Sequence, residues 1–239
     1  MDNLTTLANR FGSDKGTTVG RPPHRYTFLY DLLFHPLRDQ PIALAEIGLA
    51  VGGPELGGVV DRRVASPSAA MWQAYFPQAR TFGFDISDFA HLESPRFTFV
   101  RGDSGEAADL RRLAAAGEGF DVIIDDGSHA SYHQQLTLRI LFPCLRPGGL
   151  YIIEDLHWQS PRYEAVLPPV PRTADFLHHF LLNDIYIENR LFSRAEMTRL
   201  RETAASFALF PDFSGAGGGG GIKLAVLRAG PAGGASLGW

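Results

Sequence analysis

Residues 120–158, FDVIIDDGSHASYHQQLTLRILFPCLRPGGLYIIEDLHW, decide the fold. Two apolar runs within this stretch, 122–124 and 150–153, are short and rich in β-branched residues, which is typical of strands buried on both faces. Between them, residues 131–145 carry apolar side chains at helical spacing, and Pro147-Gly148-Gly149 ends that helix. The stretch therefore predicts two parallel, neighbouring strands joined by a right-handed helical crossover.

Each of the two predicted strands ends in a pair of acids, Asp125-Asp126 and Glu154-Asp155. Because the carboxyl ends of parallel strands share one edge of the sheet, and open α/β sheets bind ligands there, we expect the four carboxylates to converge. His129 follows a few residues after the first pair, on the same face if the helix has already begun. Like charges so close together are costly unless a cation neutralises them, so the sequence predicts a metal site.

Upstream of this unit the sequence predicts two more buried strands that end near acids. In the first, residues 42–47, Glu46 is expected to face a ligand or a hydrogen-bond donor, because an acid inside an apolar strand is costly. Gly48 then opens a turn at which the backbone can approach a nucleoside. The second strand, residues 80–86, ends at Asp85, where nucleotide-binding α/β proteins hold a ribose; the alternative is a solvated acid at a strand end.

A third strand at 97–100 precedes Asp103 and Ser104, which indicate either an adenine contact or the start of the helix at 105–116. Residues 49–67 are rich in Gly and form a long loop, and such loops are usually functional or disordered. Ser66 is the expected N-cap of the next helix, with Pro67 in its first turn.

The N-terminal region allows two interpretations. Residues 1–20 are polar around Ser13-Asp14-Lys15, and residues 24–34 form an amphipathic helix that contains Tyr26. The segment 1–40 is either a lid over a ligand or a mobile terminus with a docking helix. His24 is expected to be a surface or boundary residue.

The C-terminal region departs from the strand–helix alternation. Four prolines make 157–175 an irregular surface segment, and helices are expected at about 173–189 and at 193–200. The last strands, 205–210 and 222–227, have no room for a helix between them and form an antiparallel hairpin at the sheet edge. Residues 229–239 are expected to be a disordered tail, which leaves one α/β domain at 1–228 with seven strands, mostly parallel.

Composition limits the classes of protein that the chain can belong to. Its 239 residues, 45% hydrophobic and 20% charged, suit one globular α/β domain. A net charge of −4 argues against nucleic acid or an anionic membrane as a partner. The single cysteine, Cys144, rules out an internal disulfide, suits a reducing compartment and is most simply a small buried hydrophobe. The chain opens with no signal-peptide pattern and has no apolar run of about 18 residues, so we expect a soluble, cytoplasmic protein.

The sequence predicts five parallel strands followed by a hairpin, with acids after the first three strands. This resembles the Rossmann-like arrangement of class I S-adenosylmethionine-dependent methyltransferases. Within that class the chain resembles the metal-dependent sugar O-methyltransferases of antibiotic biosynthesis, over roughly residues 8–228. The resemblance is carried by F-G-S-D-K near the start, E-I-G, F-D-I and G-D-S after the first three strands, and I-D-D-G-S-H and I-E-D. The most specific part is the combination of D-D-G-S-H with E-D, in which the Glu lies 28 residues after Asp126.

The resemblance implies a role for each matching position. Mg²⁺ would be bound by Asp126, Glu154 and Asp155, and the catalytic residues would be Asp126 with His129 as general base. S-adenosylmethionine would be held by Glu46, Asp85 and Asp103 and lined by Gly48, Ser104 and Asp125, with Ser13 and Tyr26 closing over it. The acceptor would be a deoxyhexose such as rhamnose on a macrolide or polyketide, and the protein would be a homo-oligomer.

The chemistry of methyl transfer to an alcohol independently fits these residue types. A sugar hydroxyl is a poor nucleophile at neutral pH, whereas the methyl group of a sulfonium is already electrophilic. Three carboxylates around a hard divalent cation leave about three octahedral positions for water or a vicinal diol. A general base placed beside the hydroxyl typically contributes about 10²–10⁴ in rate.

Three other interpretations of the chain stay open at this point. The acids could be helix caps and solvated strand ends. The fold could serve a cyclase or a non-methylating pathway protein, although the intact set of acids and histidine argues against this. A catechol-type O-methyltransferase acting on an aromatic diol would share the chemistry but need a tight hydrophobic slot. The Gly-rich 49–67 and Pro-rich 157–175 segments favour a bulky glycosylated acceptor instead.

Overall fold

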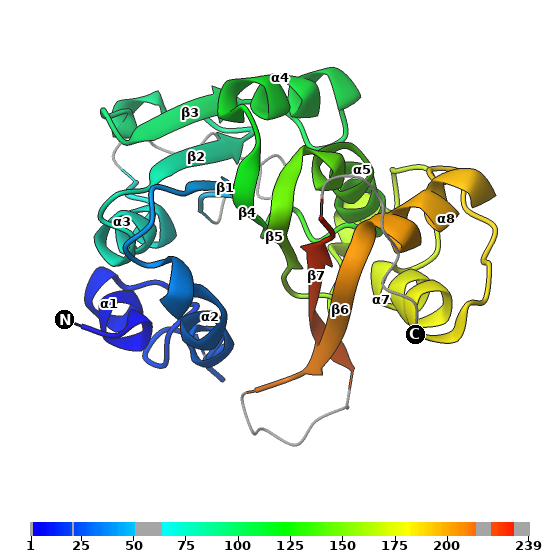
Figure 1. Cartoon of the computed structure of the whole chain (residues 1–239), viewed down its shortest axis with the longest axis horizontal. Helices are drawn as coiled ribbons and strands as arrows, with labels where there is room; N and C mark the ends of the chain where they lie inside the picture. The colour runs from blue at the N-terminus through cyan, green and yellow to red at the C-terminus, as the bar shows by residue number, and fades with distance from the viewer. Residues whose placement is uncertain (1, 21, 51–63, 214–220, 232–239) are drawn as a thin grey trace.

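Seven strands form one mixed sheet in the order β3-β2-β1-β4-β5-β7-β6 (Figure 1). The computed structural model describes residues 2–20, 22–50, 64–213 and 221–231. Its strands are β1 (Ala43–Ile47), β2 (Arg80–Asp85), β3 (Phe97–Arg101), β4 (Phe120–Asp125), β5 (Leu145–Ile153), β6 (Ala204–Pro211) and β7 (Ile222–Ala229). The first five run parallel, and β7 pairs antiparallel with both β5 and β6. The predicted fold class and terminal hairpin are therefore confirmed.

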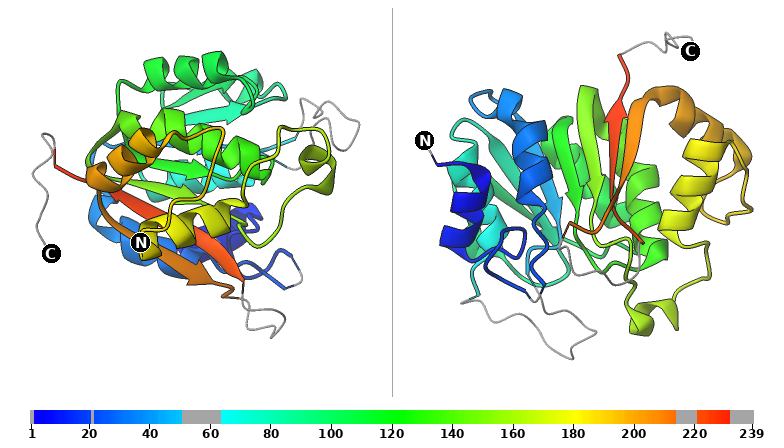
Figure 2. Two further views of the ribbon diagram at one scale, coloured as in Figure 1. Left: turned by 90° about the vertical axis from the view of Figure 1, so that its right-hand side faces the viewer. Right: turned by 90° about the horizontal axis from the view of Figure 1, so that it is seen from below.

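Helices cover both faces of this sheet, as Figure 2 shows. The sheet lies between the helices of the N-terminal part and those of the later part of the chain, so the molecule has three layers. On one face are α1 (Leu4–Phe11), α2 (Thr27–Phe34) and α3 (Pro67–Tyr75). On the other are α4 (Ala107–Gly117), α5 (Ser131–Leu141), α7 (Thr173–Leu177) and α8 (Arg194–Thr203). Short turns complete the chain: η1 (His35–Leu37), η3 (Ala90–Leu92), η4 (Phe142–Cys144), α6 (Pro161–Glu164) and the π-helical η5 (His178–Leu182).

The strands supply alternate side chains to two separate cores, because successive residues of a strand point to opposite faces. Val122 and Ile124 of β4 pack with the helices of the N-terminal layer. Ile123, between them, packs with the opposite layer together with Tyr151 and Ile153 of β5. Both strands are thus buried on both faces, which is why their sequences are apolar without alternation.

The edge at the carboxyl ends of β1, β4 and β5 is built by hydrogen bonds that continue past the strands. The Asp126 N–H donates to the carbonyl oxygen of Ile47 (2.9 Å), and the Glu154 N–H donates to that of Asp125 (2.9 Å). Asp125 and Ile153 are partners in the parallel register of β4 and β5. The two acidic pairs are therefore fixed side by side. β1 is also the point at which the strand order reverses, which is where open α/β sheets bind ligands.

Several predicted boundaries differ from those of the structure. Residues 4–11 form α1, whereas the sequence pattern indicated only a polar N-terminal segment there. The crossover helix ends at Leu141 instead of 145, and β5 starts at Leu145, so Pro147-Gly148-Gly149 lie inside the range of the strand. The helix expected to reach residue 189 ends with η5 at Leu182.

The expected tail and loop can be compared with the structure only in part. Ala229 is the last residue of β7 and not the first of a tail. Residues 232–239 of that tail, and residues 51–63 of the Gly-rich loop, lie outside the described residues. Within the described part of the chain, every helix is too short or too polar to cross a membrane.

Candidate active site

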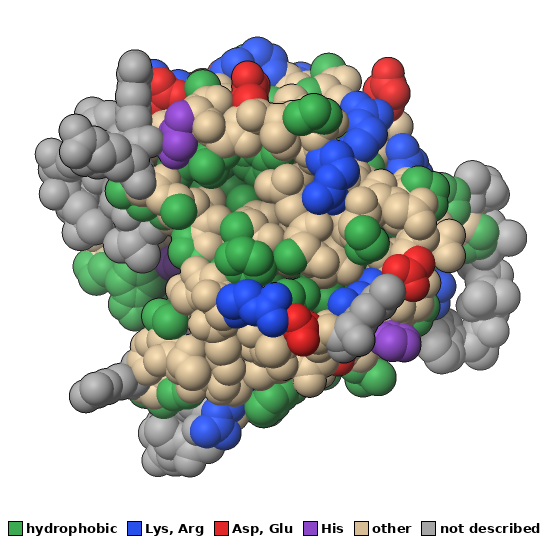
Figure 3. Space-filling model, turned by 90° about the vertical axis from the view of Figure 1, so that its left-hand side faces the viewer, with side chains coloured by type: hydrophobic (Ala, Val, Ile, Leu, Met, Phe, Trp, Pro, Cys, Tyr) green, Lys and Arg blue, Asp and Glu red, His purple; other side chains and the backbone are tan. Residues whose placement is uncertain are grey.

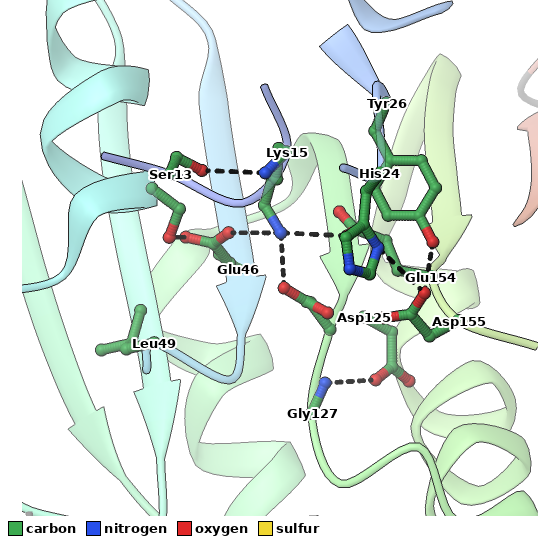
Figure 4. A network of polar contacts seen from close by, with 12 residues as sticks. Ser13, Lys15, His24, Tyr26, Glu46, Leu49, Asp125, Gly127, Glu154 and Asp155 are labelled. Atoms are coloured by element: carbon green, nitrogen blue, oxygen red, sulfur yellow. Dashed lines mark hydrogen bonds and ion pairs between the residues drawn. The ribbon is translucent and has the colours of Figure 1, made fainter. Parts of the chain in front are cut away.

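A buried lysine lies at the centre of the carboxylate cluster (Figure 4). The Nζ of Lys15 is 3.0 Å from Oε2 of Glu154 and 3.7 Å from Oε1 of Glu46, and it also donates to Asp126. The Lys15 side chain is 1% exposed. One ammonium from the N-terminal segment therefore joins acids at the carboxyl ends of three different strands, β1, β4 and β5.

Burial and the neighbouring charges together shift the pKa of each member of this cluster. Burial raises the pKa of Glu46 to about 7, although Lys15 and a hydrogen bond from Ser68 (2.8 Å) act in the opposite direction. Burial also raises the pKa values of Glu154 and Asp126, which repel each other's charge. For Lys15, burial lowers the pKa, but the surrounding carboxylates outweigh it and hold the pKa well above its usual value. The ammonium thus stays charged while the acids compete for protons.

Three side chains from the N-terminal region bind the two acids that follow β5. The Tyr30 hydroxyl donates to Oε1 of Glu154 (2.7 Å), and the Tyr26 hydroxyl donates to Oδ1 of Asp155. The two tyrosines are four residues apart and so share one face of the helical turn. His24 places its Nδ1 3.3 Å from Oδ1 of Asp155 and is half-buried, so it is a neighbour of the site and not a plain surface residue. This set holds Asp155 ionised: burial raises its pKa, but His24, His129 and Tyr26 lower it well below the ordinary value.

Asp126, His129 and Asp155 present one donor atom each within 4.8 Å of one another, which is a spacing that can hold a metal ion. The two carboxylates of this group supply oxygen donors, which suit Mg²⁺, whereas His129 offers a nitrogen. Glu154, the third predicted ligand, has both carboxylate oxygens engaged, one by Tyr30 and one by Lys15. The assignment of Asp126, Glu154 and Asp155 as metal ligands stays a prediction.

His129 reaches this group by a different local route from the one expected. The helix α5 begins at Ser131, so His129 precedes it and adopts a left-handed backbone conformation, with φ of 57°. Its Nε2 lies 3.9 Å from Oδ2 of Asp155, and its Nδ1 is buried without a hydrogen-bond partner among the described residues. A strained turn, rather than a helical face, therefore directs the imidazole toward the acids.

Asp125 does not line either of the two clefts found at this edge of the sheet. Its carboxylate is buried, accepts a hydrogen bond from the Thr137 hydroxyl of α5, and has a pKa that burial raises to about 6. Its predicted contact with the cofactor remains a prediction. In this structure its side chain instead joins β4 to the crossover helix.

The first cleft at this edge brings together four of the residues predicted to hold or line the cofactor. It is lined by Gly48, Asp85, Asp103 and Ser104, and it extends to Asp126. Gly48 has a φ of +84°, and a Cβ there would come within 2.1 Å of the Asp126 carbonyl oxygen, so only glycine allows this close approach.

Hydrogen bonds preorganise the acids of this first cleft. Asp85 accepts from the N–H groups of Leu49 (2.9 Å) and Ser87 (2.8 Å), and Asp103 accepts from that of Gly105 (2.7 Å). Glu46 is not among the lining residues; it lies behind the cleft, where Ser68 and Lys15 supply the hydrogen-bond donor and the charge that the sequence led us to expect.

Two further residues of the first cleft were not predicted from the sequence. His133, in the first turn of α5, lines it, and its Nδ1 lies 2.6 Å from the Ser128 hydroxyl. Tyr163 also lines it, with its ring 5.1 Å from that of His133. Burial lowers the pKa of His133 below the ordinary value for histidine. His133 could have been noticed in the sequence, because it lies four residues after His129. Nothing in the sequence distinguished Tyr163.

A second cleft meets the first at Asp126. It is lined by Ser13, Lys15, His129, Asp155 and Trp158, among others, and the two clefts share Gly48, Ala50 and residues 126–128. Ser13 lines this second cleft and not the first, and Tyr26 is buried with its hydroxyl on Asp155, so their closure over the cofactor stays a prediction. The surface of the N-terminal side of the molecule is mixed in character, with acidic, basic and hydrophobic side chains interspersed (Figure 3).

The strand order and the terminal antiparallel hairpin are those of the class I methyltransferase fold, and the comparison with solved structures agrees. MycE methyltransferase from the mycinamycin biosynthetic pathway, in complex with Mg, SAH and mycinamycin VI, matches with a TM-score of 0.72 and 26% identity. The match covers 100% of this chain and 57% of that one.

Sequence comparison gives the narrower resemblance. The chain is 38% identical over 190 residues to the 8-demethyl-8-(2-methoxy-α-L-rhamnosyl)-tetracenomycin-C 3'-O-methyltransferase of Streptomyces olivaceus, covering 78% of this chain and 46% of the relative. It is 40% identical over 157 residues to the mycinamicin VI 2''-O-methyltransferase of Micromonospora griseorubida, covering 64% and 36%. No protein-family model matches. The resemblance to sugar O-methyltransferases is confirmed, and the chain spans about half the length, or less, of these relatives.

Proposed function

We propose that this chain is an S-adenosylmethionine- and Mg²⁺-dependent O-methyltransferase that acts on a sugar hydroxyl, such as one of a rhamnose, in a glycosylated natural product. The observation that carries the proposal is the meeting of the two clefts at Asp126, beside His129 and Asp155. A methyl donor in one cleft and an alcohol in the other would there have a base and a set of oxygen ligands between them.

The first cleft fits S-adenosylmethionine by the chemistry of its lining. Asp85 stands at the end of β2, where its carboxylate can accept hydrogen bonds from ribose hydroxyls, and Asp103 and Ser104 offer polar contacts beyond it. The bound cofactor supplies an electrophilic methyl group. The backbone at Gly48 comes close enough to Asp126 to keep the donor cleft next to the acids.

The acids fit a divalent cation, because Asp126 and Asp155 present oxygen donors to one spot with His129 beside them. These two residues, with Glu154, would hold Mg²⁺, which when bound orients an acceptor hydroxyl and lowers its pKa. His129 would then accept the proton of that hydroxyl, and Asp155, held ionised, would stabilise the resulting imidazolium.

The relatives support the choice of acceptor. Two of their names specify O-methylation of rhamnosyl tetracenomycin C compounds, and a third specifies 2''-O-methylation of mycinamicin VI. We therefore infer that the acceptor of this chain is a polyketide or macrolide that carries a deoxyhexose.

Incubation of the protein with methyl-labelled S-adenosylmethionine, Mg²⁺ and rhamnosylated polyketides tests the proposal by mass spectrometry. We expect a mass gain of one methyl group that EDTA abolishes. In Asp126→Asn and His129→Asn we expect turnover to fall by about 10²-fold or more, because each loses a group that acts on the hydroxyl. Glu93→Gln, which changes an exposed acid that lines neither cleft, is the control and should keep full turnover. Equal turnover with and without EDTA would exclude the metal-dependent mechanism.

A further inference from the structure

Three large hydrophobic side chains that are exposed to solvent line the second cleft. They are Val19, Val64 and Trp158, which are 37%, 38% and 48% exposed. An indole that stays half exposed to water does not contribute the full stabilising free energy of its burial. Exposed apolar groups that gather at one cleft commonly mark a binding surface. The cleft thus has an apolar rim above a charged floor formed by Lys15 and Asp155.

Trp158 is fixed relative to the base and the acid of the floor. Its backbone N–H donates to the carbonyl oxygen of Asp155 (3.0 Å), which closes a tight turn after β5. Its ring centroid is 5.7 Å from that of His129, and the two ring planes are inclined by 72°. The turn and the ring contact together hold the indole at a set distance from the imidazole.

We propose that the indole of Trp158 is the platform on which the acceptor's sugar ring lies, and that Val19 and Val64 contact its apolar aglycone. This rests on the proposed sugar O-methyltransferase function. A pyranose has faces of C–H groups and a rim of hydroxyls, so its apolar face suits an aromatic ring at about 4 Å. Because the indole and the imidazole are neighbours, with ring centroids 5.7 Å apart, a sugar that lies on the indole has its hydroxyls close to His129.

The arrangement also accounts for the mixed character of the cleft. A free sugar would need only polar side chains around it, and a small planar diol would need a closed apolar slot. A sugar attached to an apolar polyketide needs a polar floor at the reacting hydroxyl, an aromatic platform beneath the ring and aliphatic groups further out. Asp155, Trp158 and Val19 supply these three in the same cleft.

Steady-state kinetics with a rhamnosylated polyketide as acceptor tests the role of Trp158. For Trp158→Ala we expect the acceptor KM to rise by about tenfold or more, while the affinity for S-adenosylhomocysteine is unchanged, because only acceptor binding is lost. Trp158→Phe should recover most of the loss. Phe28→Ala, which removes an aromatic side chain that is 56% exposed on α2, is the matched control and should leave KM unchanged.

A second measurement does not depend on turnover. In a Trp239→Phe background, Trp158 is the exposed indole and Trp72 is buried, so methyl α-L-rhamnoside should protect the exposed emission from acrylamide quenching. An unchanged KM in Trp158→Ala, or the absence of protection, overturns the role of Trp158 even if the wild-type protein methylates the acceptor. Absence of transfer by the wild-type protein, with protection observed, would overturn the proposed reaction and leave the sugar platform standing.

Discussion

Lys15 carries the positive charge on which the stability of the acidic edge depends. Its ammonium faces Glu46, Asp126 and Glu154 from inside the molecule, and it is 1% exposed. Removing one partner of a buried ion pair leaves the other charge without compensation, which typically costs about 3–5 kcal/mol. Glu154 and Asp126 have raised pKa values, so they take up protons more readily than ordinary carboxylates. Their protonation would relieve part of this cost.

We therefore expect Lys15→Met to lower the free energy of unfolding by about 3 kcal/mol in metal-free buffer, measured by urea denaturation. Added Mg²⁺ should restore more stability to this variant than to the wild type, because a second cation then neutralises the acids. The control is Arg10→Met, which breaks an exposed ion pair with Asp2 and should cost less than about 1 kcal/mol. Equal losses in the two variants would contradict the central role of Lys15.

Glu46 makes the stability of the protein depend on pH. Its pKa is raised to about 7 by burial, from a model-compound value of 4.5. The folded state therefore binds this proton more tightly than the unfolded state does. Stability from this group is fully present below about pH 4.5, is lost as the pH rises to about 7, and changes no further above that.

The size of this effect follows from the two pKa values. A difference of about 2.5 units corresponds to roughly 3 kcal/mol. Glu46→Gln should remove most of the decrease in unfolding free energy between pH 4.5 and pH 7, measured without metal or cofactor. Glu93→Gln, an exposed acid, is the control and should keep the wild-type slope. A wild-type slope in Glu46→Gln would show that another group titrates in this range.

At the scale of elements, the sheet could be predicted because each strand is marked by its own short run of residues. The runs around β4 and β5 are apolar without alternation, and the acids follow directly, so their position at one edge follows from the residue pattern and the parallel topology alone. The hairpin of β6 and β7 followed in the same way from a link too short for a helix.

Prediction failed wherever tertiary contacts override local preference. α1 has three buried positions, Leu4, Leu7 and Ala8, spaced at helical intervals, but polar neighbours conceal them in the sequence. The strand β5 runs through Pro147-Gly148-Gly149 because its pairing with β4 tolerates a register shift near Phe120. The position of His129 depends on a left-handed turn, which no periodic pattern predicts.

The candidate site shows the same division. Residues that directly end or follow strands, such as Asp85, Asp126 and Asp155, could be placed by topology alone. The lysine at the centre could not, because Lys15 is 111 residues from Asp126 and 139 residues from Glu154 in sequence. Contacts at such separation depend on how the N-terminal segment packs, and a single sequence contains no pattern that records it.

At the scale of the whole molecule, the question is whether this chain suffices for cofactor binding although it spans only 46% of a relative such as the tetracenomycin 3'-O-methyltransferase. Gly48, Asp85, Asp103 and Ser104 all lie at one edge of one sheet. The helices that cover both faces of that sheet are supplied by the same chain. The described residues of this chain therefore form the first cleft by themselves in this structure.

We expect S-adenosylhomocysteine to stabilise the isolated chain as a single cooperative unit. At a ligand concentration 100 times Kd the gain is about 2.7 kcal/mol, which raises Tm by about 5–10 °C for a domain of this size. EDTA should leave this shift unchanged, because Asp85 lines only the first cleft, whereas Asp155 lines only the second. Asp85→Asn should reduce the shift at the same ligand concentration, because an amide accepts ribose hydrogen bonds less strongly than a carboxylate. Scanning calorimetry measures both, with Glu93→Gln as the control. A full shift in Asp85→Asn would place the ribose contact elsewhere, and no shift in the wild-type chain would mean that the donor cleft requires a part of the protein beyond these residues.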